Sequence, residues 1–329
     1  MGGGGDFTVT LTKKVVAAML PMQEHWLPLS NLNLLLPPLD VSVFFCYKNP
    51  HDQRVNGGDD FTFGSMIGVL NKAISPEHWR PIMHCQGKLW AHADVRLEDL
   101  DLYNPDVSIE GKLVPKKNGV LSVQVTISHS LCISNVVLVG ACTFDHRIAD
   151  AYSANMFLVS WAEMAQSKPL SVVPSFRRSL LNIRRLGSYD PSLDDMYVPI
   201  SALPPPRAQQ PGGADPLISR IYYVMAEQLS LLQMLATSKS SSYKRTKIES
   251  FSAFLWKMVA KSAVGENDNK KICKMGIVMD RRMRLSSGDE DKAAVMATYF
   301  ANVLSIPFGE KMIDEPKVKP FELGGRCRS

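Results

Sequence analysis

The chain has 329 residues, of which 45% are hydrophobic and 21% charged, and its formal net charge is +5. This length is sufficient for two domains or one large one, with well-formed hydrophobic cores. The mild positive charge is dispersed in small clusters, which excludes a basic nucleic-acid-binding stripe. One or two of these clusters could instead meet the phosphate of an anionic cofactor.

The six cysteines are spread along the chain, and no two of them have the C-x-x-C spacing. This pattern favours free thiols in a reducing compartment over a disulfide framework. No spacing of histidines and cysteines matches a zinc site, so no metal is predicted. The N-terminus lacks the apolar segment of a signal peptide, and no apolar run could span a bilayer. A cytoplasmic protein is therefore expected.

The first half of the chain predicts alternating strands and helices. β-branched and aromatic runs indicate strands, and apolar residues at helical spacing indicate helices. In chain order, the predicted elements are strands 9–16 and 41–47, helix 63–74, strands 120–127 and 136–144, and helix 151–165. The third and fourth strands are expected to be neighbours, with the fourth buried on both faces. Residues 75–92 show no clear period and stay unassigned.

A segment rich in proline and glycine, residues 190–216, contains seven prolines and cannot form a regular element. We interpret it as a crossover linker between an N-terminal domain, residues 1–189, and a second domain, residues 217–329. The second domain is expected to contain strand 219–224, helices 226–236 and 247–263, strand 274–279, a mixed segment 293–304 and a frayed tail.

The chain contains one His-x-x-x-Asp, at His146 and Asp150, between the predicted strand 136–144 and helix 151–165. An imidazole titrates near neutrality, so it can take a proton from a substrate without a large change of its environment. A motif of this kind also occurs by chance, so its meaning depends on the surrounding motifs.

Several further blocks occur in the order found in the plant BAHD acyltransferases, and with the HxxxD motif they make the chain resemble that family over most of residues 8–310. The blocks are Leu29-Ser30-Asn31-Leu32 with Asn33 in place of Asp, Thr246 to Lys257, Met279 to Leu285, and Tyr299-Phe300-Ala301-Asn302. The surroundings look closest to coniferyl alcohol and hydroxycinnamoyl acyltransferases.

The resemblance implies an α/β fold like that of chloramphenicol acetyltransferase, with two domains of mixed sheets flanked by helices. It also implies an incomplete second domain, because family members continue beyond position 329 and carry a D-F-G-W-G motif that is absent here. Residues 75–92 also depart from the family pattern. We therefore expect a C-terminally truncated member with a near-complete first domain.

The family's reaction joins an acyl-CoA thioester to a hydroxyl or amine, so the resemblance implies acyl-CoA as a co-substrate and no permanently bound cofactor. His146 is implied as the general base. Asp150 is expected to point away from the imidazole and to pair with Arg282, bracing the loop. Ser252 and Lys257 lie in a block that resembles a cofactor-facing helix, although an ordinary helix surface explains them equally well.

The expected function is acyl transfer to a plant specialised metabolite of the phenylpropanoid alcohol type, by a cytoplasmic monomer with small-molecule partners and neither nucleic acid nor membrane. Asp145 is interpreted as a loop carboxylate rather than a catalyst. One alternative is a catalytically inactive, truncated family member that binds a ligand or partner without turnover. Another is an unrelated hydrolase that uses His146 and releases free acid without an acceptor.

Overall fold

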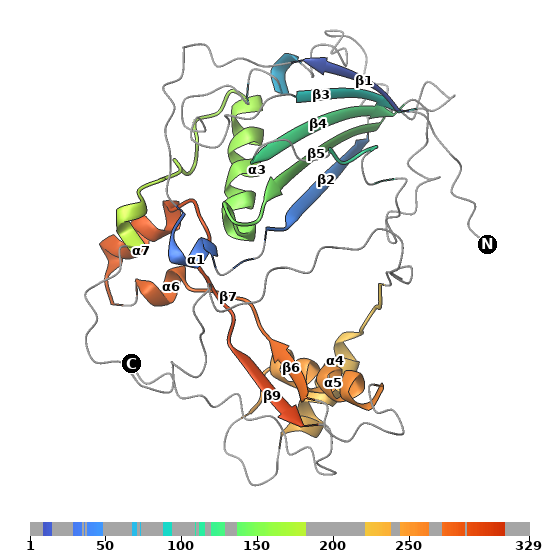
Figure 1. Cartoon of the computed structure of the whole chain (residues 1–329), viewed down its shortest axis with the longest axis vertical. Coiled ribbons are helices and arrows are strands. Elements are labelled where there is room, and N and C mark those ends of the chain that lie inside the picture. The colour runs from blue at the N-terminus through green and yellow to red at the C-terminus, as the bar shows by residue number, and fades with distance from the viewer. Residues whose placement is uncertain are drawn as a thin grey trace, which may run out of the picture. The chain divides into compact units, whose positions relative to one another are not determined.

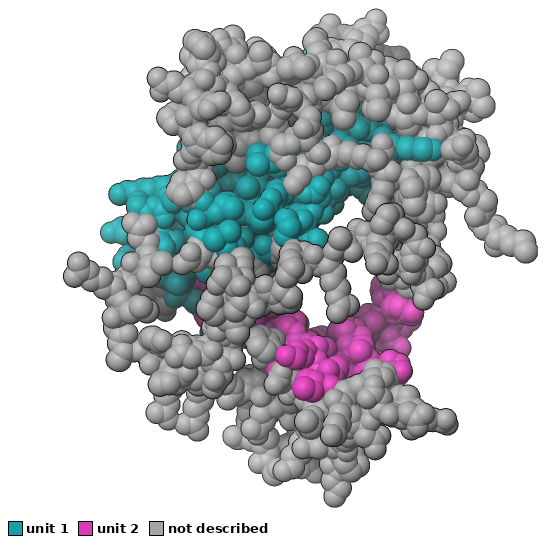
Figure 2. All heavy atoms as spheres, viewed as in Figure 1, with its two compact units in different colours: residues 1–220, 282–303 teal, residues 221–281, 304–329 magenta. Residues whose placement is uncertain are grey.

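The computed structural model describes residues 9–14, 29–34, 36, 38–48, 68–70, 73, 88–93, 109, 112–115, 120–128, 137–181, 221–237, 244–262, 272–286 and 288–312. The chain divides into two compact units (Figure 2), unit 1 with residues 1–220 and 282–303 and unit 2 with residues 221–281 and 304–329. The predicted second domain, residues 217–329, is continuous in sequence. Unit 2 differs from it because residues 282–303 make their buried contacts within unit 1. The predicted linker lies outside the described residues.

Unit 1 is built on a five-stranded sheet with the order β1-β3-β4-β5-β2 (Figure 1). β3 and β4 run parallel, and the other neighbours in this sheet are antiparallel. The antiparallel β4–β5 pairing confirms the two predicted neighbouring strands, and β3 occupies the end of the unassigned segment. The strands are β1 (Val9–Lys14), β2 (Asp40–Lys48), β3 (Lys88–Ala93), β4 (Leu121–Ser128) and β5 (Val137–Asp145).

Helix α3 (Ala151–Ala165) packs against the apolar face of this sheet and has the predicted bounds. Its stripe Ala154, Phe157 and Trp161 is buried in one cluster with apolar side chains of β4 and β5. The opposite face of the sheet is buried too but more polar, since Gln124 donates to the carbonyl of Lys112 at 2.6 Å. β5 is therefore buried on both faces, as predicted.

Four short helices complete the described part of unit 1: α1 (Asn31–Leu34), the 3-10 helix η4 (Arg178–Leu181), α6 (Arg282–Leu285) and α7 (Glu290–Thr298). Of the predicted helix 63–74, the structure describes residues 68–70 and 73, which are helical. A second buried cluster, of Met296, Tyr299, Ala301 and Val303, packs against leucines of α1 and η4. This cluster anchors the segment after α7 in unit 1.

Unit 2 contains two helices and two small sheets in its described residues. The helices, α4 (Ala226–Ala236) and α5 (Lys247–Ser262), agree with prediction. α5 begins with a capping box, because the Thr246 N–H donates to Glu249 Oε2 at 2.6 Å and the Glu249 N–H to Thr246 Oγ1 at 3.2 Å. The sheets pair β6 (Ile272–Gly276) with β9 (Phe308–Met312) and β7 (Met279–Asp280) with β8 (Leu304–Ser305).

Two predicted strands of unit 2 are corrected by the structure. Residues 221–224 form no strand, although they are aromatic and β-branched; Tyr222 and Tyr223 are 81% and 87% exposed, and no described strand pairs with them. The predicted strand 274–279 is two strands, because Ile277 leaves the ladder and its N–H donates to the carbonyl of Pro307 at 3.0 Å. None of the helices in the described residues is long and apolar enough to cross a membrane.

Candidate active site

His146 lies in a tight turn directly after β5. The turn closes where the Ile148 N–H donates to the carbonyl of Asp145 at 3.0 Å. Both backbone polar groups of His146 are also held from elsewhere in unit 1. Its N–H donates to the carbonyl of Leu39 at 2.9 Å, and its carbonyl accepts from Asn302 Nδ2 at 2.7 Å. The main chain at this residue is therefore fixed from two sides.

The imidazole of His146 is half-buried, and its Nδ1 is buried without a hydrogen-bond partner among the described residues. In a serine-protease-type triad, a carboxylate accepts from this atom and orients the ring. Among the residues that the structure describes, no carboxylate does so. Asn302 is fully buried, and within the described part of the chain its Oδ1 has no hydrogen-bond partner.

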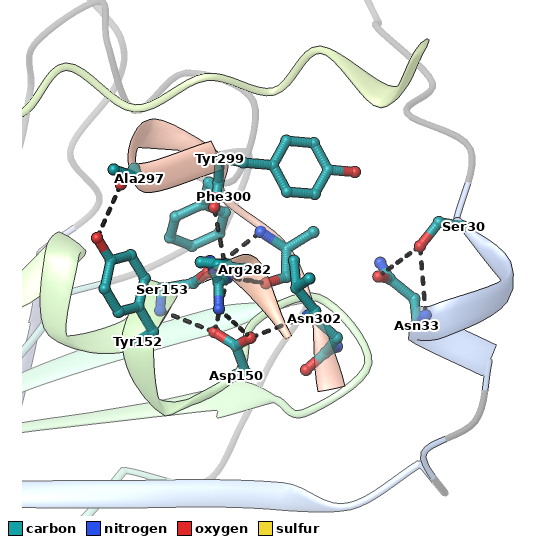
Figure 3. A network of polar contacts seen from close by, with 12 residues as sticks. Ser30, Asn33, Asp150, Tyr152, Ser153, Arg282, Ala297, Tyr299, Phe300 and Asn302 are labelled. Carbon is teal, nitrogen blue, oxygen red and sulfur yellow. Dashed lines mark hydrogen bonds and ion pairs between the residues drawn. The ribbon is translucent and has the colours of Figure 1, made fainter. Parts of the chain in front are cut away.

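The carboxylate of Asp150 points toward Arg282 at the start of α3 (Figure 3). Its Oδ1 accepts from the Ser153 N–H at 2.9 Å, which caps the helix, and its Oδ2 accepts from the Val303 N–H at 3.0 Å. The side chain is 1% exposed. With these bonds and an arginine on both oxygens, this carboxylate belongs to the frame of the loop.

The arginine is Arg282, the residue that the resemblance pairs with Asp150. Its Nη1 donates to Asp150 Oδ2 at 2.8 Å and its Nη2 to Oδ1 at 3.1 Å. Nη2 also donates to Ser153 Oγ at 3.1 Å and to the carbonyl of Ala301 at 2.7 Å. The guanidinium carbon lies 4.4 Å from the ring centroid of Tyr152. A buried pair of this kind is stable only while both partners are present.

A second ion pair joins the two sequence neighbours of His146, Asp145 and Arg147. Arg147 donates from Nε to Asp145 Oδ1 at 3.0 Å and from Nη2 to Asp145 Oδ2 at 2.6 Å, and its backbone N–H donates to Oδ1 at 2.9 Å. The side chain of Asp145 is 5% exposed and that of Arg147 40%. The hydrogen bond with Asp145 raises the pKa of Arg147, with a further contribution from the charge of Asp40.

The two weaker candidates, Ser252 and Lys257, lie on α5 of unit 2, whereas His146 belongs to unit 1. Ser252 is half-buried and Lys257 is exposed. Five residues of an α-helix turn the chain through about 140° beyond one full rotation, so the two side chains do not share a face.

A small apolar cavity lies under the His146 loop, inside unit 1. Cys142 is one of its lining residues, and burial raises the pKa of that thiol to about 12. The lining consists of Leu121, Cys142, Phe144, Ile148, Ala149, Ala154, Phe157 and Phe300, and so does not include His146. Within the described part of the chain, no three His, Cys, Asp or Glu side chains gather at one point to hold a metal.

Sequence reasoning assigned no role to Asn302 or Arg147. Asn302 is the last residue of the Tyr299-Phe300-Ala301-Asn302 block. Its hydrogen bond to the His146 carbonyl joins residues 156 positions apart. Arg147 stands inside the HxxxD motif, two residues after Asp145. Its charge, opposite to that of Asp145, was the only feature of the sequence that could have suggested an ion pair. The two charged side chains meet here because residues 145–148 form a turn, and this turn was not predicted.

The described part of unit 1 is thus a mixed sheet covered by a helix, with the histidine of an HxxxD motif at the end of a buried strand. The sequence profile of the Transferase family matches residues 89–325. The chain therefore belongs to this family, that of the BAHD acyltransferases which its motifs resemble.

Hydroxycinnamoyltransferase from Narcissus pseudonarcissus is 25% identical over 311 residues, 86% of this chain and 66% of that protein. Omega-hydroxypalmitate O-feruloyl transferase from Arabidopsis thaliana is 24% identical over 270 residues, 74% of this chain and 56% of that protein. The chain thus spans less than two thirds of the length of these relatives within the aligned regions.

Solved structures share the fold. Vinorine synthase matches with a TM-score of 0.59 at 15% identity, covering 95% of this chain and 73% of that one. TRI101 from F. sporotrichioides, crystallised with coenzyme A and T-2, matches with a TM-score of 0.55 at 14% identity, covering 86% of this chain and 67% of that one. At these identities the likeness shows the fold alone.

Proposed function

We propose that the protein transfers an acyl group from an acyl-CoA thioester to the hydroxyl or amine of a plant specialised metabolite, with a phenylpropanoid alcohol as the acceptor. The observation that carries the proposal is His146 itself. Its backbone is fixed by Leu39 and Asn302, and its buried Nδ1 has no hydrogen-bond partner among the described residues. A main chain fixed in this way holds the base in one place relative to a substrate hydroxyl.

In the proposed reaction, His146 takes the proton of the acceptor hydroxyl while the oxygen attacks the thioester carbonyl. The carbon–sulfur bond then breaks, and the departing thiolate recovers the proton from the imidazolium. No covalent enzyme intermediate forms. A positioned general base of this type contributes roughly 10²–10⁴ in rate. Asp150 and Arg282 take no part in proton transfer, because their buried ion pair holds the loop.

The names of the relatives support this substrate class: they are hydroxycinnamoyl and feruloyl transferases, and one from Nicotiana tabacum is a shikimate O-hydroxycinnamoyltransferase. Coenzyme A in the TRI101 crystals supports the donor. Ser252 and Lys257 remain weak candidates for contacts with the donor. We further propose that the protein acts in the cytoplasm as a monomer.

Release of coenzyme A from hydroxycinnamoyl-CoA, followed with DTNB, tests the proposal in the wild type and in His146→Ala. We expect release that depends on a phenylpropanoid alcohol and falls by roughly 10²–10⁴ in the variant. Equal rates in the two proteins would remove His146 as the base. Release of free acid without an acceptor would instead indicate a hydrolase.

Binding without turnover is a second candidate function, favoured by the exposed apolar residues of unit 2. α4 has no buried residue, and Tyr222, Tyr223 and Leu235 are each more than two thirds exposed. Isothermal titration with coenzyme A distinguishes the two functions, since binding with no thiol release supports the second.

A further inference from the structure

We propose that Asp145 and Arg147 act together as positioning residues for His146, a role that rests on the proposed function. The catalytic imidazole of a triad is oriented by an acidic side chain, but Asp150 is engaged by Arg282, Ser153 and Val303. The orientation of the His146 ring must therefore come from the conformation of its own turn, and the Asp145–Arg147 pair sets that conformation.

The pair encloses His146 from both sides along the chain. The Asp145 carboxylate accepts from the backbone N–H of Arg147 and from its guanidinium, at distances between 2.6 and 3.0 Å. The same turn is closed by the Ile148 N–H on the carbonyl of Asp145. An aspartate that accepts from the backbone two residues later is a recognised way to fix a turn. Here the guanidinium of Arg147 bonds the same carboxylate and holds the turn a second time.

The geometry of the pair is specific to arginine. Nε and Nη2 address the two carboxylate oxygens separately, which a lysine cannot do with its single ammonium. The burial of Asp145 makes this geometry matter, because the charge of a carboxylate with 5% exposure needs a partner. Asp40, at the start of β2 and opposite Asp145 in the sheet register, adds negative charge that favours the guanidinium.

The pair acts through the backbone rather than through substrate. The Asp145 carboxylate holds the backbone N–H of Arg147, directly after His146, and both of its oxygens accept from the Arg147 guanidinium. Misplacing a catalytic group by about 1 Å is sufficient to lower a rate roughly 100-fold. Loosening the turn should therefore lower kcat and leave substrate binding unchanged.

The kinetic test compares Arg147→Met, Arg147→Lys and Asp145→Asn with the wild type in the DTNB assay. We expect kcat to fall roughly 10- to 100-fold in Arg147→Met and Asp145→Asn, with KM for both substrates within about twofold. Arg147→Lys should restore little. A rise in KM with unchanged kcat would overturn the proposal, because Arg147 would then be a substrate-binding residue.

Arg177→Met is the matched control, because Arg177 is exposed and also bonds a side chain two residues later, from Nε to Ser179 Oγ at 3.2 Å. It should leave kcat and KM unchanged. If kcat stayed at the wild-type value in Arg147→Met and Asp145→Asn while His146→Ala lost activity, this inference would fail and the proposed function would stand.

A second readout needs no turnover. In protein labelled at histidine Cε1, the NMR resonance that disappears in His146→Ala identifies the ring. We expect one sharp signal in the wild type and in Arg177→Met, and a shifted, broadened signal in Arg147→Met and Asp145→Asn. An unchanged His146 signal in these two variants would overturn the proposal, whatever the catalytic activity of the chain.

Discussion

Replacing Asp150 by alanine separates the buried ion pair from an ordinary helix cap. The change removes the acceptor of the Ser153 and Val303 N–H groups and of both Arg282 nitrogens. Loss of a helix cap costs about 1 kcal/mol. Leaving a buried charge without its partner costs about 3–5 kcal/mol. The expected loss, about 4–6 kcal/mol, is a large share of the total stability of a typical domain.

Asp289→Ala provides the matched control. Asp289 caps α7 in the same way, accepting from the Lys292 N–H at 2.9 Å, but it is exposed and none of the described residues forms an ion pair with it. Its replacement should cost about 1 kcal/mol. The difference between the two variants is therefore the contribution of the buried pair at Asp150.

Urea unfolding followed by circular dichroism measures the free energy of unfolding, and hydrogen exchange reports on the Ser153 and Val303 amides directly. We expect both amides to exchange faster in Asp150→Ala. The double variant Asp150→Ala, Arg282→Met should be more stable than Asp150→Ala, because it no longer buries an unpaired charge. If Asp150→Ala were no more destabilising than Asp289→Ala, the reasoning would be refuted.

Two further predictions concern buried polar groups near the loop. Asn302→Ala leaves the His146 carbonyl without its donor; we expect about 1–3 kcal/mol of lost stability in urea unfolding and a lower kcat, and a variant as active as the wild type would contradict this. For Cys142, the thiol pKa rises from 9.0 to about 12 on folding, so the unfolded chain releases this proton first and stability falls as the pH rises from 9 to 12. The slope, up to ~1.4 kcal/mol per pH unit, should be missing in Cys142→Ala, and identical slopes in the two proteins would rule it out.

The local pattern of the sequence was sufficient to predict the elements that carry the histidine. β5 and α3 each have a long apolar pattern with one clear period, so the strand and the helix could be placed, whereas the turn between them was not predicted. Residues 221–224 show the limit of such patterns. Their aromatic and β-branched side chains favour a strand, but a strand also needs a hydrogen-bonded neighbour, which a single segment does not reveal.

The contacts of the loop with distant residues were less accessible. Arg282 was proposed as the partner of Asp150 through resemblance alone, since no spacing rule connects residues 132 positions apart. The contact between Asn302 and His146 likewise joins residues that are far apart in the sequence. Such contacts depend on how α6, α7 and the segment after them return to unit 1, and this is a property of the tertiary fold rather than of local periodicity.

The return of residues 282–303 to unit 1 has a consequence for synthesis on the ribosome. Asp150 emerges 132 residues before Arg282 and 153 before Val303, so the HxxxD loop must wait for both. At ~5–20 residues per second, the arginine arrives roughly 7–26 s after the aspartate. During that interval the nascent chain carries the Asp150 carboxylate without its counter-ion. A chaperone that binds the HxxxD loop would therefore act on the nascent chain in this interval.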